Sequence, residues 1–522
     1  MFADNLEALW DARPTTLGGY GVLIIALSTV YSISWMVYNL YFHPLSAYPG
    51  PFWARSSYLW YVNTLVRGTL PFSVYHAHQK YGDIVRIAPD ELAYNDARSW
   101  KDIYGHRPGK SEIPKDPNFY TNTAAGHLSI IAAASDRHAA QRRLLSHGFS
   151  EKALRDQEPT LQYYVDLFIR RLRDLSVTGE RIDIVQWYNF FTFDVIGDLA
   201  FGESFHCLET GRNHPWIEFI FKIIIQGTYA RAADHYPIVK TLLLSFIPKS
   251  IREGLEAHVA LMKSKALHRL NMKTDRPDFM TRMAAPNSGI TEKEFVASAD
   301  TILLGGSETT ATLLSGATYY LLQNPRVLDK LVQEIRSSFS SEEQIDGVGV
   351  NKLDYMLACL DETFRLYPPV PGALPRRTVL EDTLAGEHVP PNTTIAIYQW
   401  AMYRSSKYFS RPLEFIPERW LGDPEFANDN RAVVMPFSNG PRNCIGRNLA
   451  YMEMRLVLTR LLFNFDIKPT PAIQGWLKQK VFLLWDKPPL WVTLQPRDVK
   501  SRPEVLGLPS AEAFIEGRGL VK

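Results

Sequence analysis

Cysteine is scarce in this chain, which has 3 cysteines among 522 residues. The number is odd, and Cys207, Cys359 and Cys444 are not clustered in the sequence. A disulfide framework uses an even number of closely spaced cysteines, so the pattern argues against one and indicates a reducing compartment. A Cys/His cluster at metal-ligand spacing and a recognisable pairing of nucleophile and base are missing as well, which argues against a zinc or thiol hydrolase.

The chain also lacks a large excess of positive or negative charge. The 57 Lys and Arg residues nearly balance the 55 Asp and Glu residues, which leaves a formal net charge of +2. Because the chain has no dense basic run either, no nucleic acid partner is expected. Internal repeats, Gly/Ser linkers and low-complexity tracts are absent, so one large domain is expected, although length alone would suggest about three.

A long uncharged run stands near the N-terminus. The segment Leu17–Tyr41 contains no charged side chain and exceeds the ~20 residues that a bilayer-spanning helix needs. It is also longer than the ~7–15-residue apolar region of a signal peptide, so a single-pass membrane anchor is predicted. Arg13 is the one basic residue before the run, whereas Arg55, Arg67 and Lys80 follow it. This asymmetry favours a cytosolic position for the rest of the chain.

The rest of the chain shows mostly helical periodicity. Long amphipathic or apolar segments predict helices at 161–175, 294–323 and 452–465. Shorter alternating runs predict strands at 83–95 and 393–403. We therefore expect a mainly α fold with a smaller β-sheet region.

One cysteine has unusual neighbours, in the stretch "PFSNGPRNCIGRNLA". A thiolate is the ligand form of cysteine, and the nearby positive charge of Arg442 favours a thiolate at Cys444. Gly440 and Gly446 would let the backbone pass close to a flat ligand. Phe437 can pack around the sulfur, and backbone amides at the start of the following helix can donate to it. The stretch thus predicts a buried thiolate that supports a metal cofactor.

The pattern Phe437-x-x-Gly440-x-Arg442-x-Cys444-x-Gly446 closely resembles the heme-binding loop of cytochrome P450 enzymes. The resemblance implies the cytochrome P450 fold, preceded here by a single transmembrane helix. It also implies heme b (iron protoporphyrin IX), with Cys444 as the axial thiolate ligand of the metal.

The resemblance covers nearly all of residues 48–494 and suggests a domain organisation. The expected parts are an N-terminal lumenal segment at 1–16, a transmembrane anchor at 17–42, a proline-rich hinge at 43–52, a heme-thiolate catalytic domain at 53–500 and a C-terminal tail at 501–522.

Two other segments match the same family. In "LDETFRLYPPVP", Glu362 and Arg365 are three residues apart, so they can pair on one face of a helix. By resemblance, Arg419 in "FIPERW" joins them in a buried network that braces the loop around the thiolate. The role of this network would be structural, because deleting one partner would leave a buried charge unpaired.

The segment "LLGGSETTATLL" carries the second chemical signal. Gly305 and Gly306 lie in a helical pattern, where each costs about 1 kcal/mol relative to alanine. Missing side chains there would admit a macrocycle and dioxygen. Glu308 and Thr309 follow, an acid beside a hydroxyl, which suits local opening of the helix and proton relay. By resemblance this is the oxygen-activation helix, with Glu308 and Thr309 as catalytic residues.

Buried heme propionates need cationic or hydrogen-bonding partners. His138 and Arg142 are four residues apart and match the family's aromatic-x-x-x-Arg pair, with histidine in the aromatic position. Arg376 matches the family's propionate-binding arginine, although the adjacent Arg377 leaves the register open. Arg442 is the third candidate arginine. The predicted cofactor-binding residues are therefore His138, Arg142, Arg376, Phe437, Arg442 and Cys444.

The resemblance implies a heme-thiolate monooxygenase that uses dioxygen to hydroxylate a lipophilic small molecule. The chain has no G-x-G-x-x-G fingerprint and no flavin-binding pattern, so electrons would come from a separate NADPH-cytochrome reductase. The segments "YPGPFWARS", "KYGDIVRIAPDELAYND" and "KDPNFY" further resemble membrane-bound fungal members that oxidise terpenoid or polyketide secondary metabolites. An endoplasmic reticulum membrane location with a cytosolic catalytic domain is expected.

Two alternatives stay open. The same fold could catalyse desaturation, oxidative coupling or rearrangement, and the chain could instead be a membrane-tethered heme sensor or carrier. The pair of acid and alcohol argues against a carrier, which has no evident use for it. By resemblance, substrate contacts are expected in four regions, at 106–128, 219–236, 370–374 and 480–485.

Overall fold

A computed structural model describes residues 16–120, 129–245, 249–272 and 278–499. The helices in these ranges are α2 Leu17–Val37, α3 Phe52–Ser56, α4 Leu59–Val66, α5 Leu70–Tyr81, α6 Ser135–Leu145, α7 Glu151–Ser176, α8 Ile184–Phe201, α9 Cys207–Thr210, α10 Pro215–Asp234, α11 Pro237–Ser245, α12 Lys249–Asn271, α13 Glu292–Gln323, α14 Pro325–Ser338, α15 Gly347–Val350, α16 Asp354–Leu366, α17 Gln399–Tyr403 and α18 Arg447–Asn464. The strands are β1 Ile84–Ala88, β2 Glu91–Tyr94, β3 Ile182–Asp183, β4 Arg376–Arg377, β5 Asp382–Leu384, β6 Glu387–Val389, β7 Thr394–Ile397, β8 Phe465–Pro469, β9 Lys480–Phe482, β10 Leu484–Asp486 and β11 Trp491–Pro496. The predicted tail, and the predicted lumenal segment apart from its last residue, lie outside the described residues.

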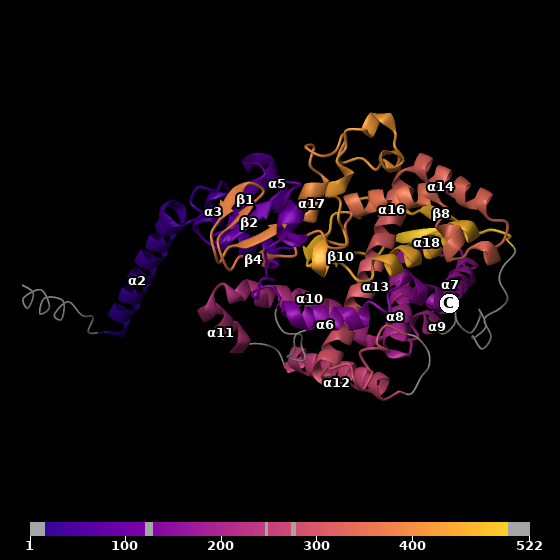
Figure 1. Cartoon of the computed structure of the whole chain (residues 1–522), viewed down its shortest axis with the longest axis horizontal. Coiled ribbons are helices and arrows are strands. Elements are labelled where there is room, and N and C mark those ends of the chain that lie inside the picture. Colours follow the sequence, from indigo (N-terminus) through magenta and orange to yellow (C-terminus); the bar gives the residue numbers. More distant parts are fainter. Residues whose placement is uncertain (1–15, 121–128, 246–248, 273–277, 500–522) are drawn as a thin grey trace, which may run out of the picture.

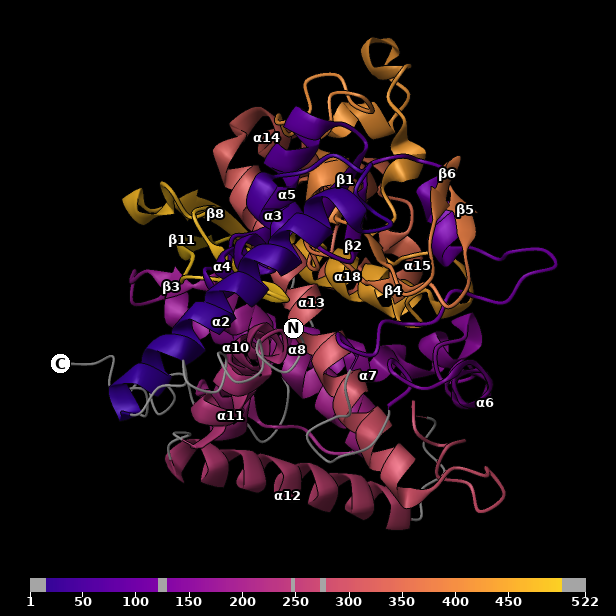
Figure 2. The same cartoon turned by 90° about the vertical axis from the view of Figure 1, so that its left-hand side faces the viewer.

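Helices make up most of the molecule and the sheets are small, which confirms the predicted fold class (Figure 1). The largest sheet has the strand order β1-β2-β7-β4 and lies beside α3 and α5. Its strand β2 is antiparallel to β1 and parallel to β7, with Leu92 opposite Ile395. The long helices α7, α8, α13 and α18 form the other side of the body, and α12 runs along its lower edge in both views (Figures 1 and 2).

Helix α13 is central to this helical part, and its start is encoded locally. The backbone N–H of Glu294 donates to the Thr291 hydroxyl at 3.3 Å, and the Glu294 carboxylate accepts from the Thr291 N–H at 3.0 Å. This reciprocal capping box satisfies donors that a helix start leaves free. The helix then continues through Gly305 and Gly306 to Gln323.

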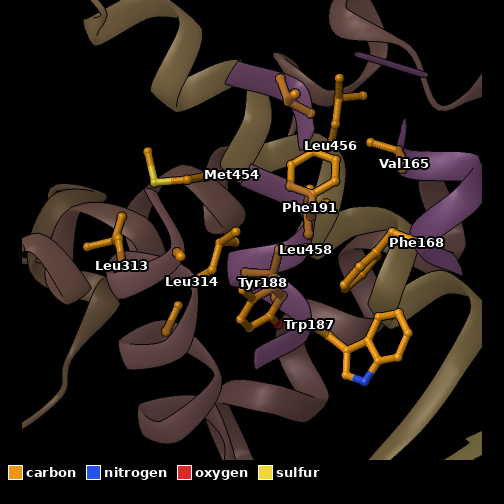
Figure 3. Packing of buried hydrophobic residues seen from close by; sticks show 14 of the residues in the cluster. Val165, Phe168, Trp187, Tyr188, Phe191, Leu313, Leu314, Met454, Leu456 and Leu458 are labelled. Atoms are coloured by element: carbon orange, nitrogen blue, oxygen red, sulfur yellow. The ribbon is translucent and has the colours of Figure 1, made fainter. Parts of the chain in front are cut away.

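The core lies where α7, α8, α13 and α18 meet. Figure 3 shows side chains from all four helices interleaved there, among them Phe168, Tyr188, Leu314 and Leu458. All four are at most 1% exposed, and the hydroxyl of Tyr188 lies 2.8 Å from that of Thr318 on α13. Replacing one such large apolar side chain with alanine typically costs about 2–5 kcal/mol. The core therefore fixes α13 firmly against α8 and α18.

One predicted strand is only half right. The run 393–403 begins as strand β7, but its second half is the helix α17. There the N–H of Trp400 donates to the carbonyl of Pro371 at 3.0 Å, and the Trp400 ring meets those of Phe72 and Trp485 edge-on or nearly so. These contacts with distant segments override the local strand preference of the aromatic residues.

Helix α2 stands away from the body (Figure 1). Together with the following π-helical turn η1 (Tyr38–Phe42), it forms an apolar helix of 26 residues. No residue in the most apolar part of this helix is buried. By length and composition it could cross a membrane, as an anchor would. The position agrees with the predicted span 17–42.

The exit from this helix is held by a buried arginine. Arg86 on β1 is fully buried, and its guanidinium donates to the carbonyls of Asn39 at 2.8 Å and of Pro89 at 2.7 and 2.9 Å. Asn39 is also fully buried, and its side-chain amide donates to the carbonyl of Ser56 at 3.0 Å. The end of the apolar helix is thus hydrogen-bonded to the sheet.

Candidate active site

The Cys444 loop lies between the short 3-10 turn η7 (Gly440–Arg442) and the start of α18. The Cys444 N–H donates to the Phe437 carbonyl at 2.8 Å, which closes the loop on itself. The Phe437 ring packs against those of Phe364 on α16 and Tyr451 on α18, with centroids 5.1 and 5.4 Å apart. Aromatic packing from two helices therefore sets the position of the loop.

The Cys444 side chain is exposed in the protein chain alone, although protein atoms crowd around it. Desolvation by these atoms raises the pKa of the thiol, while the Gly446 N–H and the positive charge of Arg142 lower it. Both of the lowering groups favour the anionic form, and direct coordination deprotonates a thiol outright. No group of three or more His, Cys, Asp or Glu side chains that could hold a metal occurs within the described ranges. Cys444 is thus suited to be a single protein ligand to a metal that a cofactor supplies.

The structure explains the need for glycine at only one of the two loop positions. Gly440 has a φ of 70°, and a Cβ there would lie 2.0 Å from the carbonyl oxygen of Tyr104. A Cβ at Gly446 would meet nothing closer than the ring of Phe149 at 3.8 Å and the Cys444 sulfur at 4.0 Å. Gly440 is therefore required by close backbone packing against the turn η2 (Trp100–Tyr104), and not by a flat ligand as the sequence suggested.

The predicted bracing network is confirmed. Glu362, Arg365 and Arg419 are all fully buried, and the Glu362 carboxylate accepts from Arg365 at 2.8 and 2.9 Å and from Arg419 at 3.0 Å. Burial acts to raise the pKa of Glu362, but the two arginines outweigh it and lower the pKa. Asp429, which the sequence did not single out, pairs with Arg419 and completes the network.

The network reaches the segment that leads to the Cys444 loop. Arg365 donates to the carbonyls of Tyr403 at 3.0 Å, Pro412 at 2.6 Å and Glu414 at 2.9 Å. Since these three carbonyls belong to irregular backbone or a helix end, the guanidinium replaces the hydrogen bonds that regular structure would provide.

A cationic cluster forms beside the loop. Arg442 donates to Glu112 at 2.7 Å and to the carbonyl of Ala133 at 2.8 Å. Arg142 donates to the carbonyl of Asn443 at 2.7 Å, and Arg376 to that of Ile113 at 3.0 Å. Arg142 and Arg442 thus come together at the loop.

His138 and Lys115 belong to the same cluster. Burial and the charges of Arg442 and Arg142 lower the pKa of His138 to about 4. Burial and the charges of Arg376 and Arg442 hold the pKa of Lys115 well below its usual range. No sequence pattern singled out Lys115, because its place in the cluster depends on how the segment 106–120 folds back onto β4.

This cluster fits the propionates of heme. Its positive groups face the single carboxylate of Glu112, and the buried Nε of Arg376 has no hydrogen-bond partner in the part of the chain that the structure describes. Two further carboxylates would satisfy both the unpartnered donor and the excess of positive charge. Arg377 points elsewhere and pairs with Asp90 at 3.5 Å and Asp116 at 3.9 Å, so Arg376 fits the predicted propionate position better than Arg377 does.

The two glycines of α13 also differ in the space around them. A Cβ at Gly306 would lie 2.5 Å from Cδ1 of Ile196 on α8, so Gly306 serves helix packing. A Cβ at Gly305 would meet nothing within 4 Å. The hydroxyl of Thr309 donates to the Gly305 carbonyl at 2.6 Å, on the same face. Gly305 and Thr309 therefore line open space, as an oxygen-binding site requires.

Glu308 is fully buried, and its hydrogen bonds do not go to Thr309. Oε1 of Glu308 accepts from Lys487 and, at 3.2 Å, from the hydroxyl of Thr312. Burial raises the pKa of Glu308, and the charge of Lys487 opposes the shift. The sequence did not predict the role of Lys487, which lies 179 positions away.

The four predicted substrate regions meet at one cavity of about 40 Å³. Its lining includes Phe119, Arg231, Ala373, Val481 and Leu483, which represent all four regions. Phe482 and Trp485 are buried, and the Trp485 ring stacks on that of Tyr367 at 4.4 Å. Parts of the regions 106–128 and 219–236 lie outside what the structure describes.

Comparison with known proteins agrees with this geometry. The family model "Cytochrome P450" matches residues 47–493. The chain is 44% identical to cytochrome P450 monooxygenase astA of Talaromyces wortmannii, over 91% of this chain and 97% of that protein. It is 44% identical to cytochrome P450 monooxygenase tpeC of Talaromyces stipitatus, over 93% and 97% of the two chains. It is also 44% identical to averantin hydroxylase of Dothistroma septosporum, over 93% and 92%.

Proposed function

The chain belongs to the cytochrome P450 family and is an oxygen-incorporating oxidoreductase, and from this premise we propose that it hydroxylates a lipophilic small molecule of fungal secondary metabolism. The proposed substrate class is a terpenoid or polyketide intermediate. The main structural support is Cys444, a lone metal-ligand candidate flanked by a cationic cluster with an unpartnered donor. Similarity to averantin hydroxylase favours hydroxylation over the other outcomes of the fold.

Heme b would be held from two directions. The Cys444 sulfur would bind the iron, and Arg142, Arg376 and Arg442 would hold the propionates, with His138 as a neutral hydrogen-bond donor. When bound, heme supplies the chemistry of dioxygen activation, with electrons that come from NADPH through a separate reductase.

Two residues of α13 would carry out the proton transfer that accompanies dioxygen activation. The Thr309 hydroxyl donates to the Gly305 carbonyl and can turn to donate into the open space beside Gly305. Glu308, one residue before it, is the nearest acid in the sequence and would replenish that proton.

The four predicted regions would contact the substrate. They would have to separate to admit it, because a typical small-molecule site has roughly 300–1,000 Å³ and their shared cavity has about 40 Å³. Its wall combines apolar side chains with Arg231 and Glu91, which suits a lipophilic molecule that carries a few polar groups. We further propose that α2 anchors the enzyme in the endoplasmic reticulum membrane, with the body in the cytosol, where it would meet the NADPH-cytochrome reductase.

Turnover under labelled dioxygen tests the proposal. The full-length enzyme, NADPH and a reductase are incubated with candidate terpenoids and polyketides, and products are examined by mass spectrometry. Retention of one labelled oxygen atom in the product is expected. Conversion without label would instead indicate desaturation, coupling or rearrangement, and heme binding without any conversion of NADPH would favour a sensor or carrier.

A further inference from the structure

A second cavity, of about 160 Å³, lies where α8, α10 and the β9–β10 hairpin meet. Its wall includes Ile224, Phe482 and three polar side chains, Asn189, Asp486 and Lys487. Asp486 is exposed, whereas the side chain of Lys487 is only 3% exposed, so the cavity wall includes both a surface residue and a buried one. The volume accommodates several water molecules.

Three of the nine side chains that line this cavity are polar and provide sites for water. The amide oxygen Oδ1 of Asn189 is buried and has no hydrogen-bond partner among the described residues. A buried amide oxygen without a partner is unfavourable, and a bound water would satisfy it. An apolar pocket of the same size would stay dry, so this one unsatisfied group matters.

Lys487 connects the cavity to α13. Its ammonium group pairs with Oε1 of Glu308 and donates to the hydroxyl of Thr312 at 2.8 Å. The side chains of Lys487 and Glu308 are only 3% and 0% exposed. Oε2 of Glu308 is buried and lacks a hydrogen-bond partner in the described part of the chain. One carboxylate oxygen is therefore held by a lysine of the cavity wall, and the other remains able to accept a proton.

A buried ion pair of this kind is a poor source of stability. Two apolar side chains of similar size would typically hold the hairpin against α13 as well or better, because both charges lose their hydration. The charges thus call for another explanation, and the position of Glu308 beside Thr309 provides one.

We propose that Lys487, which lines the 160 Å³ cavity, is a positioning residue: it holds Glu308 as a carboxylate behind the cavity wall, so that water in the cavity supplies protons to Glu308. The inference rests on the role proposed above for Glu308 and Thr309. In each catalytic cycle, Oε2 of Glu308 takes up one proton that originates in bulk water. Glu308 then passes this proton toward Thr309. Glu308 then returns to the carboxylate form, and Lys487 keeps its proton throughout.

The test compares Lys487→Met, which removes the charge at nearly constant length, with Lys487→Arg, which retains it. Lys478→Met, at an exposed lysine of the same region, is the matched control. The reconstituted holoenzyme is assayed for hydrogen peroxide released per NADPH oxidised, a ratio that needs no organic substrate. Infrared spectroscopy independently detects the carboxylic acid band of a protonated buried glutamate.

We expect Lys487→Met to raise the peroxide ratio and to show a carboxylic acid band that disappears in Lys487→Met/Glu308→Gln. Lys487→Arg and Lys478→Met should resemble wild type in both measurements. Asn189→Leu, which removes the unsatisfied amide oxygen from the cavity wall, should raise the peroxide ratio without a new band.

Three results would overturn these statements. If Glu308→Gln raises the peroxide ratio while Lys487→Met matches wild type in both measurements, Glu308 acts without Lys487 and only the present inference fails. If neither variant changes the ratio, the role of Glu308 in the proposed function fails as well. A wild-type ratio in Asn189→Leu would show that water reaches Glu308 by a route other than this cavity.

Discussion

The guanidinium of Arg365 donates two hydrogen bonds to the Glu362 carboxylate, at 2.8 and 2.9 Å, in a site where both side chains are fully buried. Removing one partner would leave the other as an unpaired buried charge, at a cost of about 3–5 kcal/mol. Glu362→Gln should therefore lower the free energy of unfolding by about that amount and reduce the heme content of the purified protein. Chemical denaturation and the heme absorbance measure the two effects.

The exposed pair Arg411 and Glu414 has the same spacing along the chain and is the control for that experiment. Exposed pairs contribute little because water screens them. Glu414→Gln should leave both the unfolding transition and the heme content unchanged. Equal loss in the two variants would contradict the idea that burial of Glu362 decides the effect.

The adjacent glycines of α13 give a matched pair of variants. A Cβ at Gly306 would lie 2.5 Å from Ile196, whereas one at Gly305 would enter open space. Gly306→Ala should destabilise the protein by about 1–3 kcal/mol, because it overpacks the contact between α13 and α8. Gly305→Ala should stabilise the helix by about 0.5–1 kcal/mol but impair oxygen chemistry. Thermal unfolding and the peroxide ratio separate the two effects, and the opposite ranking of stabilities would refute the assignment.

The fold class, the cysteine loop and the pair of Glu362 and Arg365 could be predicted from sequence because each depends on residues that are close together or on a distinctive spacing. Arg419, 57 residues from Glu362, was expected only by resemblance to the family. The helix 294–323 carried its own apolar pattern and its own capping box, so its start was encoded locally. The same is true of the apolar run that forms α2.

Other features could not be predicted because they arise between distant segments. Lys487 meets Glu308 only once the β9–β10 hairpin is placed on α13, and Lys115 joins the cationic cluster only through its position beside Arg376. Glycine is required at position 440 because the backbone of Tyr104 lies close to it, and no pattern within the loop reveals this contact. The helix α17 likewise replaces a predicted strand because of aromatic contacts with α5 and the C-terminal hairpin.

A buried histidine predicts a dependence of stability on pH. His78 on α5 lies with Nδ1 2.9 Å from the Gly82 carbonyl, and burial lowers its pKa from 6.5 to about 4. Between these values the unfolded chain binds more protons than the folded one, so stability is complete above pH 6.5 and is lost as the pH falls toward 4. The slope contributed by this residue is at most about 1.4 kcal/mol per pH unit.

His78→Gln should remove this contribution, which denaturation at several pH values between 4 and 7 would show. The exposed His76, two residues earlier, is the control. An unchanged slope in His78→Gln would mean that other groups carry the acid sensitivity.

The thiolate ligand is tested by Cys444→Ser. Because the loop is held mainly by the hydrogen bond to the Phe437 carbonyl and by aromatic packing, the variant should keep its fold. It should lose the absorbance of sulfur-ligated ferrous heme under carbon monoxide. Cys359→Ser, at a buried cysteine on α16, is the control and should keep that spectrum. Retention of the sulfur-ligated spectrum in Cys444→Ser would contradict the assigned ligand.

Arg376 and Arg377 test the propionate site, because they are adjacent but face different partners. The Arg376 Nε is buried without a partner among the described residues, whereas Arg377 pairs with Asp90 and Asp116. Losing one charge-assisted hydrogen bond typically costs about 1.5–3 kcal/mol, so Arg376→Gln should weaken heme binding by roughly 10- to 150-fold. Arg377→Gln should change heme affinity little. Transfer of heme to apomyoglobin measures both variants, and faster loss from Arg377→Gln than from Arg376→Gln would show that the neighbouring arginine holds the propionate.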